Sequence, residues 1–351
     1  MSGDAITGGM KHLNWLLVAC LAAPAVWAAS PAPRSGRALI GDRSAKPYLG
    51  AIVADPVSGT IFFEERADEP GYPASVVKLM DLLLIEERIE AGLLSLTNQV
   101  RVTAEAAGIG GSQVYLAENE VFPLEELLAA MTIHSANDAA VALALHVAGS
   151  RSAFVDLMNK RAAELGMTST RFHSVHGLPP AEGQEPDVST ARDLAILARE
   201  VLRHPDILRY TSVQNRPFRN GAFNLRNPDK LIGDYPGCDG LKTGYFRLGG
   251  FSIVSTAQRN GRRVIAVVLG STDKDVRNAA AADLMSKGFL GLEKIPLPPP
   301  PPVVVTNAVP APEPVKPVSH GPRLRLLLVA GVGVAALIMG FVVWRNRLPR
   351  Q

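Results

Sequence analysis

A proline-rich segment near the C-terminus limits how much of this chain can fold as one body. Residues 298–302 are consecutive prolines, and further prolines stand at positions 310, 312, 314, 317 and 322. Proline has no backbone N–H to donate and favours the extended polyproline II helix, so a stretch of this composition cannot build a packed core. We therefore predict a linker over residues 293–325, which is either a plain tether or a docking site for a proline-binding partner.

The N-terminal end carries an apolar run typical of exported proteins. Residues 13–29 are apolar apart from one asparagine, follow a basic residue, and end in small residues that suit cleavage. This pattern predicts a signal peptide over residues 1–28, with residues 29–43 as the first part of the mature chain. A start at Met10, lipidation of Cys20 and an N-terminal core helix are the alternatives that the pattern leaves open.

A second apolar run lies close to the C-terminus. Residues 326–344 contain no charged side chain. As a helix they would span about 28 Å, close to the thickness of a bilayer's hydrocarbon core. This run predicts a transmembrane helix, followed by a cytoplasmic tail over residues 345–351. Together with the export signal, it predicts that the body between the two runs lies on the extracytoplasmic side of a membrane.

The charge distribution and the cysteine count exclude two further classes of protein. The whole chain carries 36 Lys and Arg and 33 Asp and Glu, a net charge of +3. Seven bases and two acids stand from Glu293 onward, so the body itself is close to −2. A nucleic-acid-binding body would need a basic surface, and we expect no nucleic-acid partner. Cys238 is the only cysteine beyond the signal peptide, which rules out an internal disulfide in the mature chain.

The body, residues 44–292, shows strand patterns at both ends and helical patterns between them. Residues 51–64 have the pattern of a hairpin, and residues 251–258 and 263–269 of two strands joined by the strong turn signal Asn260-Gly261. Helical spacing of apolar residues predicts helices over 75–90, 123–133, 137–148, 154–165, 189–203 and 275–288. We therefore predict an α+β body whose terminal strands pair in one antiparallel sheet.

A hydroxyl and an amine stand three residues apart at the start of the first predicted helix. Ser75 and Lys78 would share one face of that helix. Serine is a poor nucleophile near neutral pH, and a lysine can take its proton only if burial or a second cation lowers the pKa of the amine. The pair therefore suits a nucleophile and its general base. Alone it is a weak signal, because surface helices often carry the same spacing.

Two other short motifs gain meaning only in combination with the first. Ser135 and Asn137 lie between two predicted helices, where they would either reach into a cleft or cap the second helix. Residues 240–245 include Lys242-Thr243-Gly244, which reads as a simple turn or as a strand whose glycine lets a ligand approach. The ordered triplet of motifs is much more specific than any one of them.

In this order, the three motifs resemble the signature of penicillin-binding proteins and serine β-lactamases. The residues around them narrow the resemblance to low-molecular-mass, serine-type D-alanyl-D-alanine carboxypeptidases, over about residues 44–291. The quoted matches are Pro73-Ala-Ser75, Ser135-Ala-Asn-Asp-Ala139, residues 172–179, residues 189–193 and Asp239-Gly-Leu-Lys-Thr-Gly244. This resemblance implies a β-lactamase/transpeptidase-like body: an antiparallel sheet flanked by helices, with a mostly helical subdomain. The chain departs from the family at Val77, where threonine is usual, and in lacking a β-rich second domain.

The resemblance also implies a role for each site residue. Ser75 would attack the penultimate carbonyl, Lys78 would act as general base, and Ser135 would pass the proton to the leaving amine. Backbone N–H groups of Ser75 and Tyr245 would form the oxyanion hole. The substrate-binding residues implied by the resemblance are Asn137, Lys242, Thr243, Gly244 and Arg277.

The implied partners are a peptidoglycan stem peptide ending in D-Ala-D-Ala, β-lactam antibiotics, and the lipid bilayer through the C-terminal helix. The implied location is the bacterial cytoplasmic (inner) membrane, with a single span and the catalytic domain on the periplasmic side. We expect no cofactor and no metal, because the seven histidines lack the paired spacing of zinc sites. His134, His173 and His176 are expected to make structural hydrogen bonds instead.

Three other functions remain open from the sequence. A class A β-lactamase would need a glutamate in a Glu-x-x-Leu-Asn setting, and only Glu182 and Glu185 lie in roughly that region. A D,D-endopeptidase would cleave peptidoglycan crosslinks with the same machinery. A non-catalytic cell-wall binder would keep the fold without the chemistry.

Overall fold

The computed structural model describes residues 47–295. The predicted signal peptide, the linker beyond residue 295, the transmembrane helix and the cytoplasmic tail lie outside the described residues. Within residues 47–295 no single helix is long and apolar enough to cross a bilayer. One pair of helices, residues 137–148 and 151–164, meets that criterion jointly, with an 84° bend between its members.

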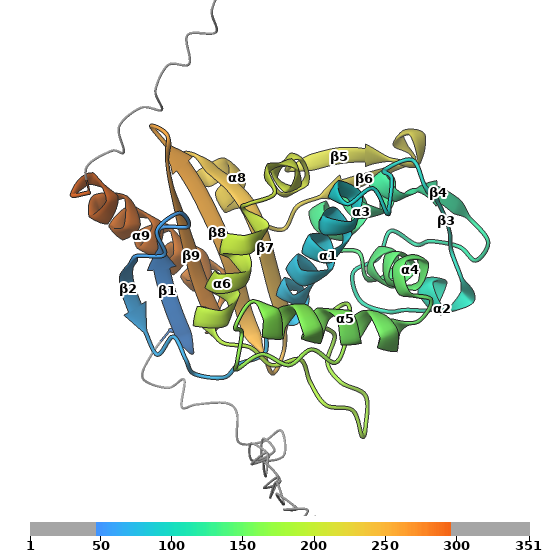
Figure 1. Ribbon diagram of the computed structural model, residues 1–351, viewed down its shortest axis with the longest axis horizontal. Helices are drawn as coiled ribbons and strands as arrows, with labels where there is room; N and C mark the ends of the chain where they lie inside the picture. Colours follow the sequence, from blue (N-terminus) through green and yellow to red (C-terminus); the bar gives the residue numbers. More distant parts are fainter. Residues whose placement is uncertain (1–46, 296–351) are drawn as a thin grey trace, which may run out of the picture. The chain divides into compact units, whose positions relative to one another are not determined.

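The centre of the body is a five-stranded antiparallel sheet with the strand order β2-β1-β9-β8-β7. Its strands are β1 (Gly50–Ala54), β2 (Ile61–Glu65), β7 (Cys238–Phe246), β8 (Gly250–Arg259) and β9 (Arg262–Ser271). Because β1 pairs with β9, the two ends of the body meet in one sheet, as predicted (Figure 1). The turn between β8 and β9 is built on Asn260 and Gly261, both with positive φ, which matches the hairpin signal.

Each face of the sheet packs against helices because alternate strand residues point to opposite sides. On one face, Val53, Ile253 and Val268 form a core with Leu284 and Met285 of α9 (Lys274–Glu293). On the other face, the alternate residues belong to the larger core, together with α6 (Ala191–Val201) and the helical block. Figure 1 shows α9 and α6 on either side of the sheet. The sheet is therefore buried on both faces.

The last helix is longer than the sequence predicts. We expected it to end near Gly288, but α9 continues to Glu293. A side chain at Gly288 would lie 2.8 Å from Val53 Cγ2, and one at Gly291 would lie 2.3 Å from the Phe62 ring. These glycines therefore serve close packing against the sheet rather than helix termination.

The helical block lies beside the sheet and matches the predicted segments within a few residues. Its main helices are α1 (Lys78–Glu90), α3 (Leu124–Ile133), α4 (Asn137–Ala148) and α5 (Arg151–Glu164). α1 and α4 are mostly buried. The α+β prediction is confirmed.

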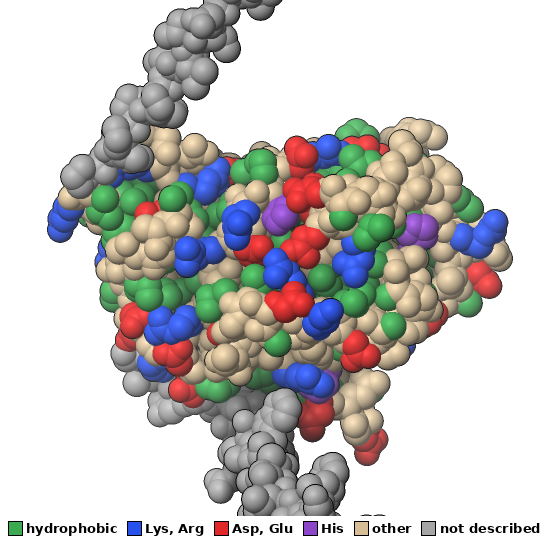
Figure 2. Space-filling view, viewed as in Figure 1, with side chains coloured by type: hydrophobic (Ala, Val, Ile, Leu, Met, Phe, Trp, Pro, Cys, Tyr) green, Lys and Arg blue, Asp and Glu red, His purple; other side chains and the backbone are tan. Residues whose placement is uncertain are grey.

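Short elements surround this block, and the sequence did not predict them, apart from η1, whose residues 75–77 begin the helix predicted over 75–90. They are η1 (Ala74–Val77), β3 (Gln99–Arg101), α2 (Ala104–Ala107), β4 (Val121–Pro123), η2 (Pro205–Ile207), α7 (Leu208–Thr211), β5 (Asn215–Phe218), η3 (Arg219–Gly221), β6 (Phe223–Arg226) and α8 (Leu231–Asp234). None is long enough to show a periodic pattern. On the face drawn in Figure 2, basic and acidic side chains intermingle rather than forming a basic stripe.

Candidate active site

The nucleophile candidate lies in a short turn that leads directly into α1. Ser75 belongs to η1, and Lys78 is the first residue of α1. This places Lys78 Nζ 3.0 Å from Ser75 Oγ. Ala74, just before the serine, has a φ of 52°, a left-handed conformation that a non-glycine residue adopts at a cost. The Ser-x-x-Lys spacing thus forms a real hydroxyl–amine pair.

Two glycines from different parts of the chain pack closely against the backbone of this turn. A side chain at Gly177 would lie 2.1 Å from the carbonyl oxygen of Ala74, and one at Gly244 would lie 2.3 Å from that of Pro73. Both would also approach the Ser75 nitrogen, at 2.8 Å and 3.1 Å. Only glycine allows this approach. Gly244, predicted to let a ligand approach, packs in the structure against the turn that carries Ser75, and Gly177 is a second close approach to this turn that the sequence does not predict.

Lys78 has the surroundings that a general base requires. Its side chain is only 1% exposed, and Nζ also lies 2.8 Å from Asn137 Oδ1 and 2.8 Å from the carbonyl oxygen of His176. Burial lowers the pKa of the Lys78 amine to about 7, although the nearby carboxylates of Asp81 and Asp187 raise it. A neutral amine can donate to these two oxygens and accept the proton of Ser75.

The second motif connects α3 to α4. Ser135 has a φ of 61° and is buried. Asn137 Nδ2 donates to the carbonyl oxygen of Gly110 at 2.7 Å, while its Oδ1 accepts from Lys78. Ala136 is the N-cap residue of α4, and no side chain caps the helix. The alternative reading of this motif as a helix cap is therefore wrong.

The third motif lies on β7, which is an edge strand of the sheet. The alternative reading of residues 240–245 as a turn is wrong. Lys242 is 3% exposed, and its Nζ donates to the carbonyl oxygen of Thr243 at 2.9 Å. Burial, with the charge of Lys78 as the next cause, holds the pKa of the Lys242 amine well below its usual range. An edge strand leaves one row of backbone groups open to an extended peptide.

The three motifs converge on one open cleft of about 400 Å³. Its lining residues are Ser75, Ser112, His134, Ser135, Arg226, Pro228, Thr243, Gly244, Tyr245, Phe251, Lys274 and Arg277. Lys78, Asn137 and Lys242 are buried and contact or adjoin these residues. The structure therefore brings together every site residue that the sequence singled out.

Arg277 projects into this cleft from the first turns of α9. Its Nε and Nη2 lie 3.0 Å and 2.7 Å from Asn278 Oδ1. Burial lowers the pKa of the Arg277 guanidinium, and the charge of Asp229 opposes that shift. A fork-shaped cation in such a place suits a carboxylate ligand.

The sequence did not predict several of the residues that line the cleft. Ser112 accepts a hydrogen bond from the Asn137 backbone nitrogen at 2.7 Å, and Arg226 and Lys274 come from β6 and α9. They lie far from the three motifs in sequence and belong to no pattern, so no signal marks them. The expectation for His134 and His176 is confirmed, since Nδ1 of each ring accepts a backbone hydrogen bond. At His173 the backbone nitrogen donates to Asp187 Oδ1 at 2.6 Å.

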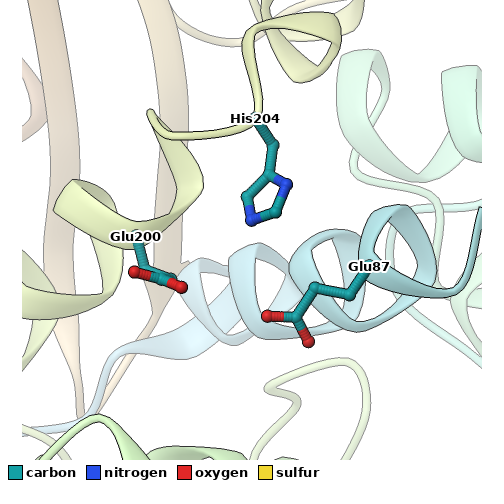
Figure 3. A group of neighbouring side chains, drawn as sticks. All are labelled: Glu87, Glu200 and His204. Carbon is teal, nitrogen blue, oxygen red and sulfur yellow. The ribbon is translucent and has the colours of Figure 1, made fainter. Parts of the chain in front are cut away.

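One group of possible metal ligands lies elsewhere in the described part of the chain. Glu87 on α1, Glu200 on α6 and His204 after α6 point toward one another (Figure 3), with ligand atoms within 4.8 Å. Arg161 Nη2, however, lies 2.7 Å from a carboxylate oxygen of each glutamate. The guanidinium therefore already supplies the positive charge that a metal ion would bring. That the protein needs no metal stays a prediction.

Comparison with known proteins agrees with this geometry. Residues 44–273 match the peptidase S11 family, described as D-alanyl-D-alanine carboxypeptidase. DacF, a D-alanyl-D-alanine carboxypeptidase of Bacillus subtilis, is 35% identical over 250 residues, which cover 70% of this chain and 63% of DacF. DacC, a D-alanyl-D-alanine carboxypeptidase of Escherichia coli, is 34% identical over 251 residues, which cover 70% of this chain and 62% of DacC. The chain thus spans less than two thirds of these relatives.

Solved structures of similar fold include penicillin-binding protein D2 from Listeria monocytogenes in its ampicillin-bound form. It is 32% identical with a TM-score of 0.63, covering 69% of this chain and 97% of that chain. The D-alanyl-D-alanine carboxypeptidase DacD from Francisella tularensis is 26% identical with a TM-score of 0.65, covering 70% of each chain. The described body therefore has the penicillin-binding, transpeptidase-like fold. By its sequence match and its fold, this chain belongs to the peptidase S11 family of D-alanyl-D-alanine carboxypeptidases.

Proposed function

We propose that this chain is an exported, membrane-anchored serine D,D-carboxypeptidase that removes the terminal D-alanine from peptidoglycan stem peptides. The observation that carries this proposal is the pair of Ser75 and Lys78, with Nζ 3.0 Å from Oγ and the pKa of the buried amine lowered to about 7. A base whose pKa lies near the operating pH is largely unprotonated and still accepts a proton well.

In the proposed reaction Ser75 Oγ attacks the carbonyl carbon of the penultimate D-alanine and its proton moves to Lys78 Nζ. The oxyanion that forms accepts hydrogen bonds from the backbone N–H groups of Ser75 and Tyr245. Ser135 passes a proton to the departing amine, the C–N bond breaks, and an acyl ester with Ser75 remains. Water then hydrolyses this ester. Each fixed oxyanion donor typically supplies about 3 kcal/mol of transition-state stabilisation.

Substrate recognition in this proposal divides between the two sides of the cleft. The stem peptide lies along the open edge of β7, and the Asn137 amide holds its backbone. The carboxylate of the terminal D-alanine binds the Arg277 guanidinium and the Thr243 hydroxyl. Lys242 orders the strand behind Thr243, since its Nζ donates to the Thr243 carbonyl oxygen.

β-Lactams would acylate the same serine. The similar Listeria protein is known in an ampicillin-bound form, which supports covalent inhibition of this chain by penicillins. The β-lactamase alternative gains no support from Glu182 and Glu185, because both are exposed and neither lines the cleft that holds Ser75. Rapid release of a penicilloyl group would require a base beside that ester.

The proposal also includes a location in the cell. The apolar runs at residues 13–29 and 326–344 support export and a single membrane span, which would place the catalytic domain on the periplasmic side of the bacterial inner membrane. Fractionation of cells expressing the full chain tests this. The chain should sediment with membranes, and a chain ending after Ile295 should not.

The test of the chemistry is covalent labelling by a fluorescent penicillin, together with D-alanine release from a peptide ending in D-Ala-D-Ala. Both should occur with the wild-type chain and disappear in Ser75→Ala. Labelling that persists in this variant would move the nucleophile to another residue. A folded chain that binds peptidoglycan but neither takes the label nor releases D-alanine would be a non-catalytic cell-wall binder.

A further inference from the structure

Asp187 is a buried carboxylate that takes no part in the reaction as proposed. It is 6% exposed. Its Oδ1 accepts hydrogen bonds from the backbone nitrogens of His173 and Ser174, at 2.6 Å and 2.9 Å, and its Oδ2 accepts from Ser174 Oγ at 2.6 Å. Burial raises the pKa of this carboxyl, and the three hydrogen bonds oppose that rise. Because hydrogen bonds to a charged acceptor are short and strong, Asp187 fixes the start of the turn that follows Phe172.

The Ser174 hydroxyl extends this constraint to the end of the same turn. Its only proton is donated to Asp187, so its lone pairs are left to accept hydrogen bonds. They accept from the backbone nitrogen of Gly177 at 2.8 Å and from that of His176 at 3.4 Å. One hydroxyl therefore connects the buried carboxylate to the last two residues of the turn.

Those two residues contact the reacting groups through their backbone. The carbonyl oxygen of His176 lies 2.8 Å from Lys78 Nζ and 3.4 Å from Ser75 Oγ. Gly177 packs against the carbonyl oxygen of Ala74, directly before the nucleophile. A carbonyl oxygen has no side-chain rotamer of its own, so its position depends on the contacts that hold the turn.

A neutral amine needs this carbonyl oxygen in order to point its lone pair at the serine. Asn137 Oδ1 and the His176 carbonyl oxygen, each 2.8 Å from Nζ, accept hydrogen bonds from its two N–H groups. The lone pair is then left for the hydroxyl of Ser75, whose Oγ lies 3.0 Å away. If the carbonyl oxygen moves, the amine can rotate and its lone pair turns away from that hydroxyl.

Asp187 also acts on Lys78 through its charge. Burial lowers the pKa of the Lys78 amine, and three carboxylates oppose this shift. They belong to Asp81, Asp187 and Asp138. The oxygens of Asp138 accept from a different loop, and those of Asp81 have no hydrogen bond within residues 47–295. Asp187 is therefore the carboxylate that combines an effect on the charge of the base with a hold on the turn beside it.

We propose that Asp187 and Ser174 are positioning residues, which together hold the turn whose carbonyl oxygen directs the lone pair of Lys78. The inference rests on the proposed function, since it needs Lys78 as the base that takes the serine proton. Neither residue touches the substrate. The hydrogen bonds of Asp187 fix the turn, and its charge stabilises the ammonium that forms on Lys78 as Ser75 attacks.

The experiment measures the rate constant of Ser75 acylation by a fluorescent penicillin against pH, with the full-length chain in detergent. Steady-state release of D-alanine from a D-Ala-D-Ala peptide gives kcat and KM for the same proteins. The variants are Ser174→Ala, Ser174→Thr, Asp187→Asn and the double variant of alanine at 174 with asparagine at 187. Ser174 is only half-buried, so its variants should fold even if Asp187→Asn does not. Denaturant unfolding, followed by far-UV circular dichroism, checks each variant.

The body offers a matched control in a second buried pair of the same kind. Thr170 Oγ1 donates to Asp193 Oδ2 at 2.7 Å, and the Ser169 backbone nitrogen donates to the same oxygen at 2.9 Å. Asp193 is 4% exposed. Within residues 47–295 this turn makes no hydrogen bond to Lys78 or Ser75. Thr170→Ala and Asp193→Asn should therefore lower the free energy of unfolding without changing the acylation rate of the folded protein.

Ser174→Ala should lower the limiting acylation rate and kcat about tenfold and leave KM unchanged, because misplacing a reacting pair slows the chemical step rather than binding. The midpoint of its pH profile should stay near 7, since Asp187 keeps its charge. Ser174→Thr keeps the hydroxyl and should retain most of the wild-type rate.

Asp187→Asn should slow acylation and also move the midpoint to lower pH, because a carboxylate that raises the pKa of Lys78 is lost. Lys242 and the His176 ring also titrate near Lys78, but burial lowers the pKa of both, and each variant leaves them in place. Because Asp187 holds the turn through Ser174, the double variant should be within about twofold of the slower single variant.

Each contrary result would overturn a different part of this reasoning. A wild-type acylation rate in Ser174→Ala would show that other contacts hold the turn, and the carboxypeptidase proposal would stand without this inference. Equal slowing in Thr170→Ala would mean that the rate follows stability rather than position. An unchanged midpoint in Asp187→Asn would remove the effect of its charge. Absence of Ser75 labelling and of D-alanine release in the folded wild-type chain would refute the proposed function, and this inference with it.

Discussion

The buried lysine of the site predicts an unusual dependence of stability on pH. In the unfolded chain Lys78 has the ordinary pKa of 10.5, whereas burial lowers its pKa to about 7 in the folded protein. Between these two values the unfolded state binds more protons than the native state. The free energy of unfolding therefore rises with pH across this window. Below about pH 7 Lys78 is protonated in both the folded and the unfolded state, and its destabilising effect on the fold reaches its full size.

The size of the effect follows from the pKa difference. A depression from 10.5 to about 7 corresponds to about 5 kcal/mol of lost stability at low pH. About 3 kcal/mol of this is regained between pH 6 and pH 9. Lys78→Met keeps an unbranched side chain of similar length but removes the titrating amine. The difference in unfolding free energy, wild type minus Lys78→Met, should thus increase by about 3 kcal/mol over that range.

Denaturant unfolding of both proteins at several pH values measures this difference. The signal should be far-UV circular dichroism, because none of the three tryptophans (Trp15, Trp27 and Trp344) lies within residues 47–295. An independent readout is the wild-type rate of penicillin acylation, which should rise with pH through a midpoint near 7 as Lys78 loses its proton. A difference in unfolding free energy that does not change with pH, or an acylation rate whose midpoint lies above pH 9, would refute the assignment of Lys78 as a neutral base.

Three further variants test the surroundings of the site. Gly177→Ala would put a methyl group 2.1 Å from the Ala74 carbonyl oxygen, at a residue whose φ is 72°. Acylation of Ser75 by penicillin should slow about a hundredfold, as it does when an oxyanion donor is lost. An unchanged rate would show that this contact does not position the turn. Arg277→Gln should raise KM for a D-Ala-D-Ala peptide about tenfold or more, since a charge-assisted hydrogen bond is lost, and steady-state kinetics with an unchanged KM would place the carboxylate elsewhere. Arg161→Met removes the cation that Glu87 and Glu200 share. Denaturant unfolding should show a free energy of unfolding lower by about 1–3 kcal/mol, and an unchanged value would mean that these ion pairs do not stabilise the fold.

The fold was largely predictable because its main elements are long enough to show periodicity. The Asn260-Gly261 turn and the apolar strands around it set the centre of the sheet, and the apolar sequence of α4 marks it as a core helix. The short strands β3 to β6 were not predictable, because three or four residues carry no pattern. Gly288 was misread as a helix end, because packing against Val53 is a tertiary cause that the local sequence does not contain.

The site was predictable only as far as its chemistry lies in short motifs. Ser75, Lys78, Ser135 and Asn137 could be proposed because their order and spacing are specific. That a backbone carbonyl, that of His176, accepts from Lys78 could not be read from the sequence. Such contacts depend on which loops the fold brings together, and any residue type can supply a carbonyl.

The turn that carries Ser75 touches two chain segments that follow it by about one hundred and one hundred and seventy residues, at Gly177 and Gly244. A ribosome must therefore finish nearly all of the body before the reactive hydroxyl acquires its surroundings. Partly synthesised or misfolded copies are then inert toward the antibiotic. Covalent labelling of Ser75 by a fluorescent penicillin would consequently report that an individual molecule has completed the folding of its body.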